Sequence, residues 1–119
     1  MITKHELDPE QQWEVLTTRL QKTMNLKTVP DLNAVLFLIG VQELGKGQQL
    51  FSKEEKQDLM HIAICKVLSY SGYYQLQGLD EQGWPHWKLV KKLPFLDILS
   101  QETYLKAHIV EYFEKEIKL

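Results

Sequence analysis

Residues 32–44 form a nearly all-apolar segment, and this segment constrains the fold of the chain more than any other feature. Its apolar side chains would point in every direction around a helix, and a helix that is apolar all round is a buried one. Asp31 before the segment and Gly45 after it are typical start and stop signals of a helix. The alternative is a buried parallel strand over 34–39, because periodicity alone cannot separate the two for a short run. The length and the boundaries favour a buried helix over 32–44.

Two capping boxes mark the starts of further helices. Asp8 is a typical N-cap acid, Pro9 lacks the N–H that would be unpaired at a first helical position, and Gln11 stands three residues after the cap. Ser52 followed by Glu55 repeats this spacing later in the chain. We therefore expect a first helix from Asp8-Pro9 and a third helix from Ser52.

Apolar residues at helical spacing define the buried sides of three helices. The third helix is expected to run to about Ser71 and to end at Gly72, and a fourth helix is expected to start after Ser100. The predicted apolar stripes comprise Trp13, Leu16, Leu20 and Met24 in the first helix, Leu59, Met60, Ala63, Ile64, Val67 and Leu68 in the third, and Leu105, Ile109, Tyr112, Phe113 and Ile117 in the fourth.

A β-hairpin is predicted between the third and fourth helices. Runs of strand-forming residues at 73–77 and 84–90 flank residues 78–83, Gly-Leu-Asp-Glu-Gln-Gly, whose composition is typical of a turn.

The position of the turn predicts the register of the hairpin. If Asp80 to Gly83 form the turn, Gln77 lies opposite His86 and Gln75 lies opposite Lys88. The other face is then expected to pack on the helices, and it carries Tyr74, Leu76, Trp87 and Leu89.

These elements together predict a mainly α fold, at the margin of α+β. We expect a four-helix core with a buried second helix and one β-hairpin between helices three and four. A length of 119 residues with 44% hydrophobic residues is typical of a single globular domain, here 1–119. A charged content of 25% is ordinary for a globular chain and unlike that of a disordered one.

Charge and apolar content argue against several classes of partner. A formal net charge of −2 gives no general attraction for a phosphate backbone, so nucleic acid is not expected. The longest apolar run, at 34–39, is far shorter than the roughly 20 residues that span a bilayer. Cys65 is the single cysteine, and residues 1–6 contain no apolar run typical of a signal peptide. We therefore expect no membrane span, no internal disulfide and a cytoplasmic location.

Residues 40–47 match the first seven positions of the phosphate-binding pattern G-x-x-x-x-G-K-[ST]. The last position fails, because Gly47 replaces the hydroxyl that holds magnesium. Glu43 would place a negative charge beside the phosphates, and the next helix cap is Ser52 instead of a residue beside the lysine. We therefore interpret Gly45 as a helix C-cap and do not expect a nucleotide ligand.

Four side chains that can ligate metals recur at helical spacing on the third helix: Glu54, Asp58, His61 and Cys65. The spacing places them in one stripe beside the apolar face. A zinc or iron site would take a further ligand from another element, either His86 or His108 with Glu111. The alternative is a solvated flank in which Asp58 faces His61 and Cys65 behaves as a small, half-buried apolar residue.

Aromatic residues are concentrated between residues 70 and 95. Tyrosine and tryptophan side chains that stay at a surface are enriched at binding interfaces. The hairpin is therefore the predicted interaction surface, comprising Tyr73, Trp84, His86, Lys88, Lys91 and Lys92. The alternative is that the hairpin caps one end of the helical core and buries its rings for stability.

The sequence contains neither the G-x-S-x-G nor the H-E-x-x-H pattern of known enzymes. Cys65 is expected inside a helix, away from the helix N-terminus where a thiolate would be stabilised. The four histidines are scattered singly along the chain. An enzymatic activity is therefore open but unsupported.

Two segments carry a resemblance to other proteins: Phe51–Ala63, which reads Phe-Ser-Lys-Glu-Glu-Lys-Gln-Asp-Leu-Met-His-Ile-Ala, and Gly83–Lys88, which reads Gly-Trp-Pro-His-Trp-Lys. In these segments the chain resembles short uncharacterised bacterial proteins of unassigned function. The resemblance implies a bacterial, cytoplasmic origin, and it carries over no functional residue.

Two functional hypotheses follow from the sequence. The first is a small non-enzymatic interaction protein that contacts a protein partner, or a second copy of itself, through the aromatic hairpin. The second is a metal-dependent or small-molecule-binding protein that uses the stripe of Glu54, Asp58, His61 and Cys65 on the third helix.

Overall fold

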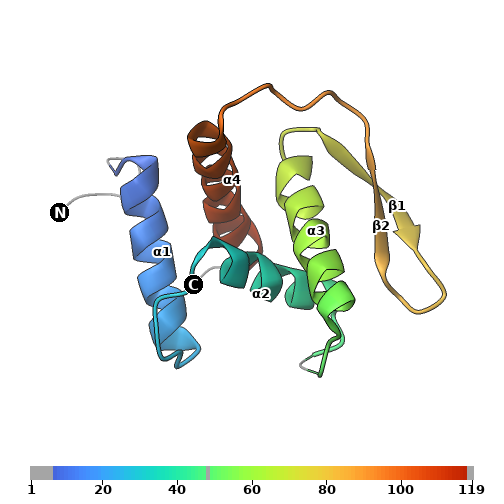
Figure 1. Cartoon of the computed structure of the whole chain (residues 1–119), viewed down its shortest axis with the longest axis horizontal. Coiled ribbons are helices and arrows are strands. Elements are labelled where there is room, and N and C mark those ends of the chain that lie inside the picture. The colour runs from blue at the N-terminus through green and yellow to red at the C-terminus, as the bar shows by residue number, and fades with distance from the viewer. Residues whose placement is uncertain (1–6, 48, 118–119) are drawn as a thin grey trace. The chain divides into compact units, whose positions relative to one another are not determined.

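The predicted set of elements, four helices with a hairpin between the third and fourth, is confirmed. A computed structural model describes residues 7–47 and 49–117 of the chain (Figure 1). In the described residues the elements follow in the order α1 (Pro9–Thr23), α2 (Leu32–Leu44), α3 (Lys53–Ser69), β1 (Tyr74–Leu79), β2 (Pro85–Leu89), α4 (Ile98–Tyr112) and the π-helix η2 (Phe113–Ile117). The fold is mainly α. Among the described residues, none of these helices is long and apolar enough to cross a membrane.

The chain divides into two compact units. The first contains α1, α4 and η2, and the second contains α2 from Asn33 onward, α3 and the hairpin. The expectation of a single domain over 1–119 stays a prediction.

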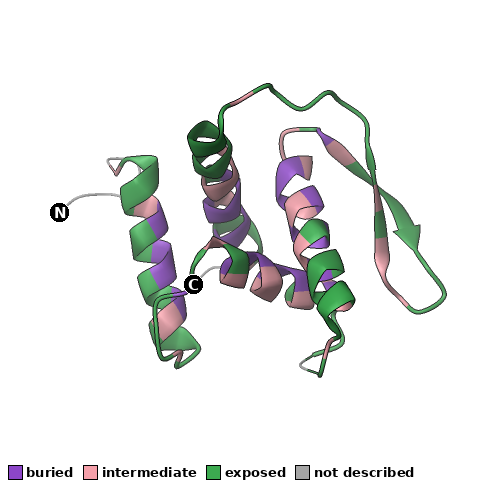
Figure 2. Ribbon diagram, viewed as in Figure 1, coloured by how far each residue is buried: buried purple, intermediate pink, exposed green. Residues whose placement is uncertain are grey.

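In the first unit, α1 begins at the predicted capping box and packs on α4. The Asp8 carboxylate accepts a hydrogen bond from the Gln11 N–H at 2.8 Å, and the Gln11 side chain accepts one from the Asp8 N–H at 3.1 Å. The Lys106 ammonium of α4 lies 5.3 Å from the centre of the Trp13 ring. Figure 2 shows the buried residues of α1 along one side of the helix, and Trp13 and Leu20 belong to that side.

The fourth helix begins three residues earlier than expected. Asp97 caps α4 by accepting a hydrogen bond from the Ser100 N–H at 2.7 Å, so the first helical residue is Ile98. Ile98 and Leu99 are 76% and 78% exposed, which means that the first turn lies outside the apolar stripe. The predicted start after Ser100 is therefore wrong, because the apolar stripe from which the helix was predicted begins after the first helical turn.

In the second unit, α2 spans Leu32–Leu44 as predicted, and the alternative of a strand over 34–39 is wrong. Its buried residues are Val35, Leu36, Ile39, Gly40 and Leu44. The predicted helix stop is confirmed, since Gly45 adopts a positive φ of 72° and its N–H donates to the Val41 carbonyl.

The helices α2 and α3 approach each other closely at Gly40. A Cβ atom built on Gly40 would lie 2.2 Å from the carbonyl oxygen of Leu59, which is a backbone atom of α3. Leu59 is fully buried. The absence of a side chain at Gly40 therefore sets how closely the two helices pack.

The hairpin departs from the expected register at one residue. Gln75 lies opposite Lys88 as predicted, but His86 lies opposite Gly78 instead of Gln77. The register shifts between Leu76 and Gly78, which is a β-bulge that leaves Gln77 without an opposite residue. Gly78 has a φ of 139°, a conformation that few other residues adopt, and it permits this bulge.

The predicted grouping of side chains on one hairpin face is confirmed by the pairs Tyr74 with Leu89 and Leu76 with Trp87. This face is only partly covered. Tyr74 and Trp87 are half-buried, whereas Leu76 and Leu89 are 49% and 47% exposed. The hairpin packs on α3, yet every residue of its two strands is exposed or only half-buried (Figure 2).

Candidate binding site between the third helix and the hairpin

A cavity of about 530 Å³ lies between α3 and the hairpin, inside the second unit. Both elements supply polar and apolar side chains to it. The lining residues are Glu55, Asp58, His61 and Ile62 from α3, and Asp80, Gln82, Trp84, Pro85, His86 and Trp87 from the hairpin.

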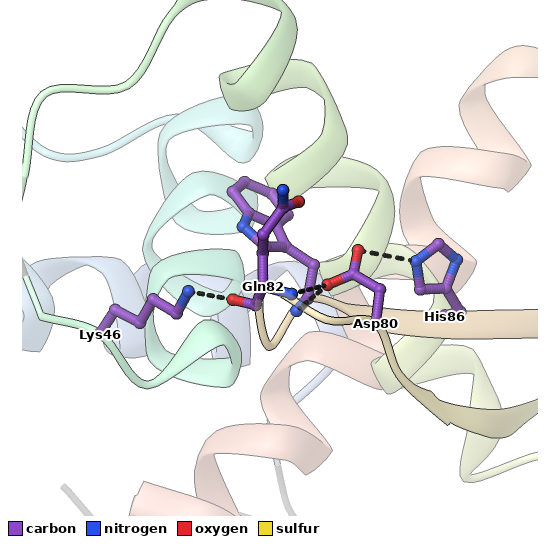
Figure 3. A network of polar contacts seen from close by, with 5 residues as sticks. Lys46, Asp80, Gln82 and His86 are labelled. Carbon is purple, nitrogen blue, oxygen red and sulfur yellow. Dashed lines mark hydrogen bonds and ion pairs between the residues drawn. The ribbon is translucent and has the colours of Figure 1, made fainter.

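Asp80 organises the hairpin side of the cavity. One oxygen of its carboxylate accepts hydrogen bonds from the N–H groups of Gln82 and Trp84, each at 2.9 Å. The other oxygen lies 3.0 Å from Nε2 of His86, as drawn in Figure 3. The Lys46 ammonium, which follows α2, donates to the carbonyl of Gln82 and holds the turn from outside (Figure 3). The turn, Trp84 and His86 are thus positioned by a single carboxylate.

The hydrogen bonds to Asp80 predict a pH dependence of the turn. The His86 ring and the N–H groups of Trp84 and Gln82 hold the pKa of the Asp80 carboxyl below its ordinary value. A carboxyl with a lowered folded-state pKa stabilises the turn at pH values above its unfolded pKa of about 3.9, and the contribution is lost as the pH falls through the lowered value. We expect the amide signals of Gln82 and Trp84 to titrate together with the Asp80 carboxyl below pH 3.8 in an NMR experiment.

The variant Asp80→Asn supplies the control for this titration. It removes the ionisable group but keeps the size of the side chain, so the two amide signals should lose their common midpoint. A midpoint at or above the ordinary carboxyl value in the unmodified chain would contradict the role of Asp80.

On the helix side, the three polar lining residues differ in how they are held. The Glu55 carboxylate accepts a hydrogen bond from the Ser52 N–H at 2.8 Å in the predicted capping box, so its position is set by the helix start. The His61 ring meets the Tyr74 ring edge-on at 6.4 Å. Asp58 is exposed and has no hydrogen-bond or ion-pair partner among the described residues. It therefore offers its carboxylate to the cavity without a competing interaction.

Trp87 is held at the cavity with its ring nitrogen buried. Its Nε1 atom has no hydrogen-bond partner among the described residues. The packing of the hairpin on α3 thus places the indole ring beside the cavity.

The stripe predicted as a metal site does not form a ligand set. Asp58 and His61 line the cavity, but Glu54 does not. Cys65 is fully buried, its sulfur lies 3.5 Å from Nε2 of His61, and burial raises the pKa of its thiol to about 11. In the part of the chain that the structure describes, no three His, Cys, Asp or Glu side chains are arranged to hold zinc, iron or another metal ion.

Of the second-element ligands considered for that metal site, His86 lines the same cavity as Asp58 and His61, whereas His108 and Glu111 belong to the other unit. The ring of His86 contacts Asp80 at 3.0 Å. His108 lies in the first unit, where its Nδ1 is 2.8 Å from the carbonyl oxygen of Tyr104, one turn earlier in α4. Glu111 is likewise on α4, and its carboxylate pairs with Lys115 at 3.0 Å.

The residues of the predicted interaction surface separate into two groups. Trp84 and His86 line the cavity, and the Trp84 ring also meets the Phe51 ring edge-on at 6.4 Å. The other four do not line it. Tyr73 is only 8% exposed and lies 4.3 Å from the Lys91 ammonium, while Lys88 and Lys92 are exposed.

Sequence reasoning missed Asp80, Gln82 and Glu55 as site residues. The sequence predicts only a turn position for Asp80 and a helix-capping position for Glu55. An aspartate at the first position of a turn accepts hydrogen bonds from the backbone two residues on, and this signal was available in the sequence. The convergence of Glu55 with Asp80 was not, because it depends on how α3 packs against the hairpin.

Comparisons of the chain with protein-family models, with curated proteins and with solved structures give no match.

Proposed function

We propose that this chain is a non-enzymatic interaction protein that associates with a second copy of itself through the hairpin. The observation that carries the proposal is the exposure of leucine side chains on the two strands. Leu76, Leu79 and Leu89 are 49%, 66% and 47% exposed. Exposed apolar side chains gathered on one element are typical of protein–protein contact surfaces.

The open edges of the hairpin support the same proposal. In the described residues the sheet has two strands, so each strand pairs on one side only. Strand edges with unpaired N–H and C=O groups are templates for pairing with another chain, and isolated two-stranded sheets are marginally stable. Association of two hairpins would supply partners for these backbone groups.

The charges of the hairpin are self-complementary. Asp80 and Glu81 lie at the turn, and Lys88 and Lys92 lie at or beyond the opposite end of β2. In a two-fold arrangement of antiparallel hairpins, the acidic turn of one copy would face the lysines of the other. This complementarity favours a second copy of the chain as the partner.

A single buried thiol suits a reducing compartment, so the cytoplasm is the proposed location.

The mass of the protein in solution, measured over a dilution series, tests the proposal. We expect a concentration-dependent equilibrium between monomer and dimer. Leu79→Glu should weaken the dimer at least about tenfold, because burying a leucine contributes about 1.5 kcal/mol or more. Val15→Glu is the matched control, since Val15 is 48% exposed on α1 and outside the hairpin.

A charge exchange tests the orientation of the two copies. Lys88→Glu should weaken association, and adding Glu81→Lys in the same chain should restore it. A mass that corresponds to a monomer at every concentration would reject the proposal.

A further inference from the structure

We propose that the cavity between α3 and the hairpin binds an organic cation with an alkyl chain, carrying a primary ammonium or a guanidinium group. The exposed leucines of the hairpin do not line this cavity. The inference therefore concerns a site other than the exposed leucines, and a free cation can bind there whether or not the chain self-associates.

The lining of the cavity is negatively charged. It contains the three carboxylates of Glu55, Asp58 and Asp80 and the two imidazoles of His61 and His86, with neither lysine nor arginine. Even with both imidazoles protonated, the carboxylates outnumber the positive charges. A cationic group is attracted into such a cavity and an anion such as phosphate is repelled.

The three carboxylates have distinct roles in this proposal. Glu55 and Asp80 are held by hydrogen bonds from backbone N–H groups, which positions them before any ligand arrives. Asp58 has no partner among the described residues, so it serves as the direct counter-ion. Pairing with a ligand does not require Asp58 to give up an existing interaction.

The apolar part of the lining suits an organic cation. Trp84 and Trp87 both line the cavity, and the face of an indole ring is the strongest aromatic partner for an ammonium or guanidinium group. Ile62 and Pro85 offer apolar contact for an alkyl chain. The volume of about 530 Å³ lies in the usual range of small-molecule sites, which is roughly 300–1,000 Å³.

Indole N–H signals in a ¹H–¹⁵N NMR titration provide a direct test on the intact chain. The probes are butylammonium and butylguanidinium, and the matched controls are butyrate and butanol at the same ionic strength. We expect saturable shifts of the Trp84 and Trp87 signals with the two cations alone. Trp13 lies on α1 in the other unit and should not respond to any probe.

Two variants on the same helix identify the counter-ion. Asp58→Asn should weaken binding of butylammonium about fivefold, because a single solvent-exposed ion pair contributes only modestly to binding. Glu54→Gln removes the same charge from a residue that does not line the cavity, and binding should stay within about twofold. Both side chains are exposed, so neither change is expected to unfold the protein.

The mass of the protein in solution, measured with saturating butylammonium, identifies the source of the cation. If the natural occupant is a lysine of a second copy, saturating butylammonium will dissociate the dimer, whereas an unchanged mass identifies a free ligand. The proposal is overturned if butanol or butyrate shifts the indole signals as strongly as the cations do. It is also overturned if the cations produce no shift, or if Asp58→Asn binds them as well as the unmodified chain does.

Discussion

Replacing Gly40 by alanine will destabilise the unit formed by α2, α3 and the hairpin by about 2 kcal/mol. The added methyl group would lie 2.2 Å from the Leu59 carbonyl oxygen and 2.6 Å from its carbonyl carbon. Both are backbone atoms, so no side-chain rotation relieves the contact, and the two helices must move apart. Overpacking of a core lowers the free energy of unfolding by about 1–3 kcal/mol, and we expect about 3 kcal/mol here because the clash is with backbone atoms. The higher helix propensity of alanine offsets about 1 kcal/mol of this loss.

The free energy of unfolding, measured by urea denaturation, tests this prediction. Gln42→Ala is the matched control because Gln42 is an exposed residue on the same helix, where alanine brings no steric conflict. We expect the control variant to be as stable as the unmodified chain or slightly more stable. Equal stability of the two variants would show that α2 and α3 do not approach as closely as described.

The thiol of Cys65 will react very slowly with iodoacetamide in the folded protein. Burial raises its pKa from 9.0 to about 11, and these two pKa units alone lower the thiolate population at neutral pH about 100-fold. The side chain is also fully buried, which hinders access of the reagent. Alkylation followed by mass spectrometry should therefore show a rate at least about 100-fold below that of the urea-unfolded chain.

A surface thiol on the same helix serves as the control for this experiment. In the double variant Cys65→Ala with Gln57→Cys, the thiol replaces an exposed side chain of α3 and should react at the rate of a free cysteine. Rapid alkylation of Cys65 in the folded chain would show that the sulfur is accessible.

The raised pKa of Cys65 also predicts how stability changes in alkaline solution. The folded state favours the neutral thiol, so its contribution to stability is complete below the unfolded pKa and is lost as the pH rises from about 9.0 through about 11. The urea midpoint of the unmodified chain should fall over this interval by more than that of Cys65→Ala. An equal fall of the urea midpoint in both proteins would contradict the raised pKa of the Cys65 thiol.

These properties of Cys65 bear on the metal hypothesis. A cysteine ligates metals as the thiolate, and burial opposes that form here. Asp58 and His61 of the same stripe face the cavity instead. In the proposed cation site, the carboxylate of Asp58 is the counter-ion and acts together with the hairpin residues.

The starts of α1 and α3 and the whole extent of α2 were determined by the sequence alone. Asp8 with Gln11 and Ser52 with Glu55 interact across three residues, so their hydrogen bonds require only a local helical turn. The extent of α2 follows from its apolar content and the glycine after it. These helix boundaries can be predicted from the sequence because the interacting groups are neighbours along the chain.

The cavity, the close contact of α2 with α3 and the register of the hairpin depend on tertiary packing. The same Glu55 that caps α3 joins Asp80 in the cavity only because the hairpin packs on α3, and they are separated by a long stretch of sequence. Gly40 is the first glycine of the rejected phosphate-binding pattern at residues 40–47, and its close approach to Leu59 assigns it to helix packing. The bulge at Gln77 shifts the register, and Gly78 permits it, but a glycine at this position is equally typical of the turn predicted from the sequence. Helix caps and turns depend on groups a few residues apart, whereas the cavity, the helix contact and the register depend on which distant segments pack together.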